Sequence, residues 1–425
     1  MNKIEIRNLY KIFGKNSVRA YELLRDGAPL SDVRDRLDVV PAVVDISLDV
    51  KDGEIFVVMG LSGSGKSSLV RCMNRLYEPT AGSIMVDGVD LTKLNNKELR
   101  RLRLEKVSMV FQHFALFPHY TVLENTGWGL EVKGVSKAVL RSKAGEALEM
   151  VGLAGWEDKY PHQLSGGMQQ RVGLARAVAT GSDILLMDEA FSALDPLIRG
   201  EMQQQLVALH GDLKKTVVFI SHDLNEAMYL GDRVAIMRGG RIEQIGTAEE
   251  ILRNPATEYV AAFVRQVDRS RVITAGSVME EPVAILAAWE GPSAALKAMR
   301  EKQVSALHLV GHGRRLLGAV YDDEVLAAVR RGESTLDPLI HPETSTVTPD
   351  TPISELLLPS AESVLPLPVT KDGRFVGVVP RVALLMALGE TARVNGAGDD
   401  TSGSVETGSG TEEGRLVGAE KSASM

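Results

Sequence analysis

The chain has 425 residues, which is too long for one ordinary domain and predicts two or three. Its 44% hydrophobic and 24% charged residues are typical of a soluble globular protein. The formal net charge is −8, basic and acidic residues balance over residues 1–276, and no basic stripe is present there, so we expect no nucleic-acid partner.

The N-terminal residues 1–10 contain no apolar stretch of the kind found in a signal peptide. No apolar run approaches the ~18–20 residues that a membrane helix needs, so any membrane role is expected to come through a partner. The one cysteine, Cys72, excludes an internal disulfide and favours a reducing compartment. We expect it to be a small core residue.

The first strand is predicted over residues 3–9, where apolar and polar residues alternate. Phe13 follows it and is the first candidate for stacking on an adenine ring, with Tyr10 second; packing alone is the alternative reading for both. Residues 15–44 form a polar detour with helical spacing before a strand resumes at residues 43–50. This detour predicts an inserted helical hairpin.

A phosphate-binding loop is predicted between a buried strand at Glu54–Met59 and a helix at Ser68–Leu76. Its glycines let backbone N–H groups turn towards phosphates, and the helix presents its positive end to the same anion. Lys66 would neutralise phosphate charge, and the Ser67 hydroxyl would hold Mg²⁺. The predicted nucleotide contacts are Gly60, Leu61, Ser62, Gly63, Ser64, Gly65, Lys66, Ser67 and Ser68.

The next buried strand, residues 107–111, ends at Gln112. Ligands bind at the carboxyl ends of strands in open α/β sheets, so Gln112 is placed to reach the metal or the attacking water. The segment Phe114–Asn125 is unusually apolar and aromatic. It is either core or a docking surface for another protein.

A second anion site is predicted where Ser165, Gly166 and Gly167 open a helix. A buried strand at Ile184–Met187 then delivers two carboxylates. Asp188 is placed to bind Mg²⁺ through water, and Glu189 to polarise an attacking water as a general base.

The segment Ser192–Asp195 follows these carboxylates and precedes a helix predicted at Pro196–Leu213. The next strand, residues 216–220, leads to His222. A histidine in that position can contact a γ-phosphate or the water that attacks it.

In this order, the residues resemble those of the ATP-binding subunit of an ABC transporter. The matching elements are Phe13, Gly60–Ser67 (Walker A), Gln112 (Q-loop), Leu164–Met168 (signature), Asp188 and Glu189 (Walker B and base), Ser192–Asp195 (D-loop) and His222 (switch histidine). Met168 stands where the commonest signature has glutamine. The resemblance implies an α/β P-loop NTPase cassette over residues 1–270, with a RecA-like core and a helical subdomain.

The resemblance also implies a head-to-tail homodimer that holds two ATP molecules. The Walker A loop of one chain would face the signature residues Ser165 and Gly167 of the other, with Asp195 beside the nucleotide. Catalytic roles fall to Glu189, His222, Gln112 and Lys66, and metal binding to Ser67, Gln112 and Asp188.

The chain most resembles the ATPase subunit of glycine betaine/proline betaine (quaternary amine) importers. This resemblance rests on the polar insertion at 15–44 and on the sequence segments at 59–67 and 189–199. This implies ATP and Mg²⁺ as cofactors, integral membrane permease subunits, and a periplasmic or lipid-anchored solute-binding protein. It also implies a peripheral location on the cytoplasmic side of the plasma membrane. Import of another small polar solute, such as an amino acid or a sulfonate, stays open. An ABC ATPase acting on DNA or ribosomes is disfavoured by the single cassette.

The C-terminal part contains an internal repeat, because residues 306–320 and 365–379 share a strand–turn–strand pattern followed by an apolar helix. Residues 276–390 thus resemble an α+β pair of tandem CBS domains. Tyr321 and Glu324, then Pro380 and Ala383, stand where such domains usually hold a ribose, which argues against ordinary AMP or ATP binding.

We hypothesise that this acidic module gates the cassette through electrostatic contacts that salt weakens over a screening length of ~10 Å at 0.1 M. A module that only buttresses the dimer is the alternative. The basic residues proposed as a local patch are Arg300, Lys302, Arg314, Arg315, Arg330 and Arg331. Residues 391–425, rich in Gly, Ser, Thr and Glu, are predicted to be a disordered tail.

Overall fold

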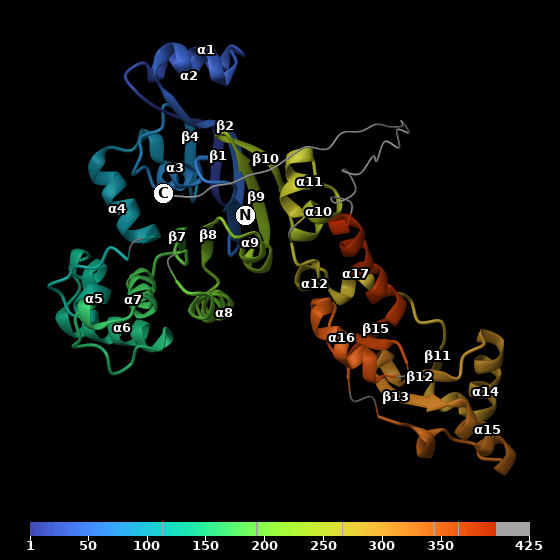
Figure 1. Cartoon of the computed structure of the whole chain (residues 1–425). Coiled ribbons are helices and arrows are strands. Elements are labelled where there is room, and N and C mark those ends of the chain that lie inside the picture. Colours follow the sequence, from blue (N-terminus) through green and yellow to red (C-terminus); the bar gives the residue numbers. More distant parts are fainter. Residues whose placement is uncertain (113, 193, 266, 343–344, 364, 397–425) are drawn as a thin grey trace, which may run out of the picture.

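The computed structural model describes residues 1–112, 114–192, 194–265, 267–342, 345–363 and 365–396. Figure 1 shows a larger N-terminal part built on two sheets and a smaller C-terminal part beside it. Over the described residues, no helix has the length and apolar character needed to cross a membrane.

A four-stranded antiparallel sheet in the order β2-β1-β4-β5 covers one side of the N-terminal part. Its strands are β1 (Asn2–Phe13), β2 (Val40–Lys51), β4 (Ala81–Val86) and β5 (Val89–Asp90). Helices α1 (Ser17–Arg25) and α2 (Leu30–Leu37) lie between β1 and β2 and pack on a small core of their own. The predicted helical insertion is therefore present.

The six-stranded sheet that carries the site has the order β10-β9-β3-β8-β7-β6, and all neighbours are parallel except β9 and β10. The strands are β3 (Ile55–Met59), β6 (Val107–Phe111), β7 (Ile184–Asp188), β8 (Thr216–Ser221), β9 (Arg233–Arg238) and β10 (Arg241–Gly246). Every residue of β3, β7 and β8 is buried, which is why these strands read as continuous apolar runs.

Helix α3 (Lys66–Met73) follows the phosphate-binding loop and buries Leu69, Val70 and Cys72 in a core shared with both sheets. The sequence predicted this helix over residues 68–76. It ends earlier because Arg75 takes a left-handed conformation, φ 54°, which a helix cannot continue through. Cys72 is fully buried, as expected, and burial raises the pKa of its thiol to about 12.

The helices of the N-terminal part form a three-helix subdomain, α5 to α7, and a set that covers the parallel sheet (Figure 1). In chain order they are α4 (Asn96–Lys106), α5 (Val122–Val132), α6 (Lys137–Met150), α7 (Gly166–Ala179), α8 (Pro196–Leu213), α9 (Leu224–Leu230), α10 (Ala248–Arg253) and α11 (Glu258–Val264). Short 3-10 turns occupy Leu91–Lys93 and Pro161–Gln163.

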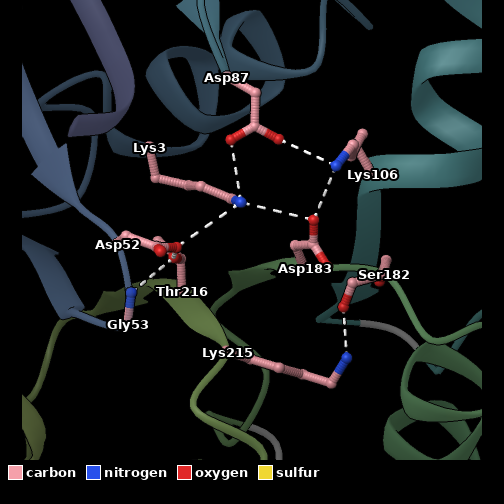
Figure 2. A network of polar contacts seen from close by, with 9 residues as sticks. All are labelled: Lys3, Asp52, Gly53, Asp87, Lys106, Ser182, Asp183, Lys215 and Thr216. Carbon is pink, nitrogen blue, oxygen red and sulfur yellow. Dashed lines mark hydrogen bonds and ion pairs between the residues drawn. The ribbon is translucent and has the colours of Figure 1, made fainter. Parts of the chain in front are cut away.

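The two sheets are joined at the amino ends of the parallel strands by a network of charges, drawn in Figure 2. Lys3 of β1 lies 2.9 Å from Asp87 and 3.4 Å from Asp183, which immediately precedes β7. Lys106 reaches the same two carboxylates at 3.2 Å and 2.9 Å. The network therefore links the antiparallel sheet, α4 and the parallel sheet at the edge opposite the predicted site.

The C-terminal part repeats one arrangement of elements. The first copy contains β11 (Ile285–Ala287), α14 (Gly291–Lys302), β12 (Ala306–Val310), β13 (Leu316–Tyr321) and α15 (Asp322–Arg331). The second contains α16 (Ile353–Glu362), β14 (Leu367–Lys371), β15 (Arg374–Val379) and α17 (Arg381–Gly396). A parallel bridge from Val347 to Val369 takes the place of β11 in the second copy. Both predicted hairpins are thus present.

Two short helices, α12 (Arg269–Val272) and α13 (Ala275–Val278), connect the parts. Further 3-10 turns lie at Ala288–Glu290, His312–Arg314 and Asp337–Leu339. Residues 391–396, predicted as tail, belong to α17, and the rest of that predicted tail lies outside the described residues.

Candidate nucleotide site

Strand register brings the predicted site residues to one edge of the parallel sheet. Phe111 pairs with Asp188, Asp188 with Ile220, and Met59 with Ser221. The residues that follow these strand ends are Gly60, Gln112, Glu189 and His222. The carboxyl edge of such a sheet is where ligands bind, so the order of strands assembles the predicted site.

The loop from Gly60 to Gly65 contains two glycines, Gly60 and Gly65, at which any side chain would collide with backbone atoms. Gly60 has φ 148°, and a Cβ there would lie 2.3 Å from the carbonyl oxygen of Met237. Gly65 has φ 102°, and its Cβ would lie 2.0 Å from the carbonyl oxygen of Ala42. The loop keeps its backbone amides close to the start of α3, as a phosphate cradle requires.

Lys66 is buried, with 4% of its side chain exposed. Its ammonium donates to the carbonyl oxygens of Gly60 at 2.9 Å and Leu61 at 3.2 Å, and lies 3.8 Å from the Glu189 carboxylate. Burial lowers the pKa of Lys66, and the Glu189 and Asp188 carboxylates act in the opposite direction. A buried ammonium in this position fits a phosphate group, which would supply the neutralising charge.

Glu189 has the left-handed backbone conformation, φ 48°, which is uncommon for glutamate. Its carbonyl accepts from the backbone N–H of Ser192 at 3.2 Å and from the Ser192 hydroxyl at 2.9 Å. Its carboxylate lies 4.0 Å from Nδ1 of His222. The turn therefore holds a carboxylate between Lys66 and His222, where an acid–base role at a phosphate is chemically possible.

Asp188 is 2% exposed and is paired with Arg71 of α3, whose guanidinium approaches its Oδ2 at 2.9 Å and 3.0 Å. Among the described residues there is no group of three or more His, Cys, Asp or Glu side chains that could hold a metal by themselves. The Asp188 carboxylate and the Ser67 hydroxyl are oxygen donors of the kind that Mg²⁺ takes, together with phosphate and water oxygens.

The two candidate aromatic residues have different surroundings. Tyr10 is 6% exposed, and its ring packs edge-on against Tyr21 at 4.9 Å in the core of the insertion, so it is a packing residue. Phe13 is partly exposed and meets Tyr77 edge-on at 5.3 Å, with the Lys11 ammonium 4.6 Å above its ring. Phe13 remains the candidate for stacking.

The predicted second anion site lies apart from the phosphate-binding loop. Ser165 caps α7 by accepting from the backbone N–H of Met168 at 3.3 Å, and Asp195 caps α8 by accepting from Ile198 at 3.1 Å. Ser165, Gly166 and Asp195 are exposed. No hydrogen bond or ion pair found over the described part of the chain joins them to residues 60–67. Ala193, within the predicted D-loop, lies outside the described residues.

Sequence reasoning missed Arg71, which pairs with Asp188, and Tyr77, whose hydroxyl accepts from Arg71 at 2.9 Å. It also missed Glu226, a carboxylate of α9 that is only 8% exposed beside the His222 loop. An acid at an apolar helix position was the available signal for Glu226.

Comparison with known proteins identifies the family to which the chain belongs. A family model described as "ABC transporter" matches residues 43–192. The chain is 48% identical to the glycine betaine/carnitine transport ATP-binding protein GbuA of Listeria monocytogenes, over 93% of this chain and 100% of that protein. The chain belongs to the ATP-binding subunits of ABC transporters.

Other relatives are consistent with this family. The glycine betaine/proline betaine transport system ATP-binding protein ProV of Salmonella typhimurium is 46% identical to this ABC ATPase over 93% of the chain and 99% of its own length. The solved structure of cbiO1 from Clostridium perfringens, part of an ABC transporter complex, has a TM-score of 0.50 at 24% identity. It covers 62% of this chain and 94% of its own and supports the cassette fold.

Proposed function

We propose that this ABC ATPase powers the import of a compatible solute such as glycine betaine or proline betaine. The observation that carries the proposal is the near full-length similarity to two proteins whose names both include glycine betaine. Glycine betaine and carnitine both combine a quaternary ammonium with a carboxylate. The proposed cargo is therefore a small zwitterion that carries a methylated ammonium group.

In the proposed reaction, the Gly60–Gly65 amides and Lys66 bind the β- and γ-phosphates, and Glu189 takes a proton from the attacking water. His222 contacts the γ-phosphate or that water, and Gln112 helps to orient the water. Ser67, Gln112 and Asp188 would hold Mg²⁺, which neutralises phosphate charge when bound. The Arg71 guanidinium contacts Oδ2 of Asp188 at 2.9 Å and 3.0 Å and would orient this carboxylate.

The functional unit is proposed to be a head-to-tail homodimer. Ser165, Gly166 and Asp195 are exposed, and no hydrogen bond or ion pair found over the described residues joins them to Lys66. One chain therefore brings together only part of the residues predicted to surround a nucleotide. A second chain would bring the N-terminus of its helix α7 to the Walker A loop of the first chain. The positive end of that helix would then face the γ-phosphate.

The proposed permease-docking surface is the aromatic cluster of Phe117, Tyr120 and Trp128, whose ring centroids lie 4.9 Å to 5.8 Å apart. Phe117 and Tyr120 are partly exposed. Arg176 of α7 supports the preceding loop by donating to the carbonyl oxygens of Ala115 at 2.7 Å and Phe114 at 3.2 Å. We propose that integral membrane permease subunits bind this surface and that the chain has a peripheral place on the cytoplasmic side of the membrane.

A periplasmic or lipid-anchored solute-binding protein would deliver the cargo to those permease subunits. Within this chain, the division into a cassette at 1–270, a tandem CBS module at 276–390 and a tail is also part of the proposal. The repeated strand–helix arrangement of the C-terminal part supports it.

Regulation of the cassette by the C-terminal module has a physical route through α12. The backbone N–H of Asp268, which caps α12, donates to Oδ1 of Asn225 on α9 at 3.1 Å. At the other end of α12, the carbonyl of Ile273 accepts from the N–H of Ile353 on α16 at 2.9 Å. A shift of α16 would thereby be transmitted through α12 to Asn225 on α9, which lies three residues after His222 in the chain. The six basic residues of the proposed patch are exposed.

The cargo proposal is tested on the transporter reconstituted with its permease and solute-binding subunits. Candidate solutes are added one at a time, and the stimulation of ATP hydrolysis is measured. Glycine betaine or proline betaine should stimulate hydrolysis at the lowest concentration. Stimulation by an amino acid or a sulfonate, with none by the betaines, would move the assignment to the alternative cargo.

A further inference from the structure

The His222 loop has an internal anchor outside the predicted catalytic set. His222 is exposed on 54% of its side chain, and its contact with Glu189 is long, at 4.0 Å. The ring is therefore placed mainly by its backbone. That backbone runs from the end of β8, at Ser221, into the first turn of α9, at Leu224.

Glu226, on α9, anchors this loop through its side chain. Its carboxylate accepts hydrogen bonds from the Ser221 hydroxyl and, at 3.0 Å, from the amide of Gln203 on α8. The Ser221 hydroxyl in turn accepts from the backbone N–H of Asp223 at 2.9 Å. The residues on both sides of His222 are thus tied to one buried carboxylate.

A separate contact already caps α9, so the helix start does not explain Glu226. Asp223 accepts from the backbone N–H of Asn225 at 2.9 Å and of Glu226 at 3.2 Å, and lies 3.6 Å from Arg199. Burying a carboxylate is costly unless it is hydrogen-bonded. Burial, the largest effect, raises the pKa of Glu226, and the hydrogen bonds from Ser221 and Gln203 act against it.

We infer that Glu226 is a positioning residue that holds the His222 backbone at the nucleotide site. It acts through Ser221, and the proposal gives it no direct contact with the nucleotide or the attacking water. The inference rests on the proposed role of His222 in ATP hydrolysis. A displacement of about 1 Å at a reacting group can cost on the order of 10²-fold in rate, so loss of this anchor should lower kcat with little change in KM.

The test is a double-mutant cycle on ATP hydrolysis by the full-length chain in the reconstituted transporter. Glu226→Ala should lower kcat by on the order of 10-fold to 100-fold in the wild-type background and by less than about 2-fold in the His222→Ala background. Glu226→Gln should retain most activity, because its amide can still accept from Ser221 while Gln203 rotates to accept from it.

Two controls separate positioning from general damage. Tyr229→Ala truncates a half-exposed ring on the same helix and should leave kcat unchanged. Thermal unfolding and binding of a non-hydrolysable ATP analogue are measured for every variant. If Glu226→Ala does not fold, Gln203→Ala takes its place in the cycle, since it removes one bond to the same carboxylate.

The outcomes are distinguishable. Losses that multiply in the double variant, or equal losses in Glu226→Ala and Glu226→Gln, would overturn the inference while leaving the proposed function in place. Full activity of His222→Ala would remove the role proposed for His222 and the inference with it. A loss confined to backgrounds that contain His222, with rescue by glutamine, supports it.

Discussion

At the scale of single residues, the site depends on charged side chains that are held close together, some in a tight pair such as Arg71 with Asp188 and others at longer range. Lys66 is buried among carbonyl oxygens and lies 3.8 Å from Glu189, while Glu189 sits at φ 48° at the end of β7. Holding a non-glycine residue there costs roughly 1–3 kcal/mol. Strained backbone conformations are common at functional sites, and here the strain lies at the residue proposed as the general base.

Replacing Glu189 by glutamine should keep the shape of the turn and remove the proton acceptor. We expect kcat for ATP hydrolysis to fall by on the order of 10²-fold to 10⁴-fold, with ATP still bound and the dimer stabilised. Single-turnover hydrolysis and gel filtration with ATP measure both effects. Rapid turnover by this variant would refute the assignment of Glu189.

Replacing Lys66 by alanine should weaken ATP binding by about 10-fold to 100-fold, because a charge-assisted contact to phosphate is lost. Lys97→Ala on α4, where the side chain is exposed, is the matched control and should bind normally. Titration with a fluorescent ATP analogue gives both affinities. Equal affinities for the two variants would contradict the role of Lys66.

Much of this site could be predicted from the sequence, since Lys66, Glu189 and His222 belong to motifs whose spacing is local. The sequence ranked Phe13 ahead of Tyr10 for stacking, but it could not show that Tyr10 is buried, because that burial depends on the insertion that packs over Tyr10. The pairing of Arg71 with Asp188 joins residues far apart in the chain. Local spacing carries no information about such a contact.

At the scale of elements, the register of the parallel strands assembles the site, and the charge network of Figure 2 fixes the opposite edge. Apolar runs predicted β3, β7 and β8 well because these strands are buried on both faces. The end of α3 was misplaced because a left-handed Arg75 leaves no clear signal in the sequence. The network joins β1, α4 and the residue before β7, which are far apart in the chain. It therefore arises from tertiary packing and could not be predicted from local sequence.

Asp183 gives this network a defined pH dependence. Its hydrogen bond from Lys106 is the largest effect and lowers the pKa of the carboxyl. A lowered pKa stabilises the folded state above the unfolded pKa, and this contribution is lost as pH falls through the folded value. Asp183→Asn should therefore lower the free energy of unfolding by about 1 kcal/mol at pH 7, with the difference shrinking below about pH 4.

Urea denaturation at several pH values measures this difference, with Asp35→Asn on α2 as a control for an exposed carboxylate. A difference between wild type and Asp183→Asn that stays constant down to pH 3 would show that ionised Asp183 does not stabilise the network.

At the scale of the whole molecule, the C-terminal part is attached next to the segment that carries His222. Helix α12 contacts α9 on one side and α16 and α17 on the other (Figure 1). The sequence predicted the internal repeat of this part but not its attachment, because the bonds of Asp268 and Ile273 reach residues on other elements.

Removal of residues 276–425 should leave basal ATP hydrolysis and abolish the response of transport to ionic strength. Because Ile353 and α16 are removed with the module, α12 would lose its distal support and could no longer transmit a change to Asn225. Removal of residues 397–425 alone is the control. Uptake is measured across a series of salt concentrations, and an unchanged salt response in the larger deletion would exclude gating by the module.

The central claim is that ATP hydrolysis by this chain drives the import of a betaine. The most direct measurement is uptake of labelled glycine betaine by cells that carry either the wild-type chain or Glu189→Gln, at low and high external osmolarity. Uptake that requires Glu189 and rises with osmolarity is the predicted result. Equal uptake with the two chains would contradict the claim that this ATPase powers betaine import.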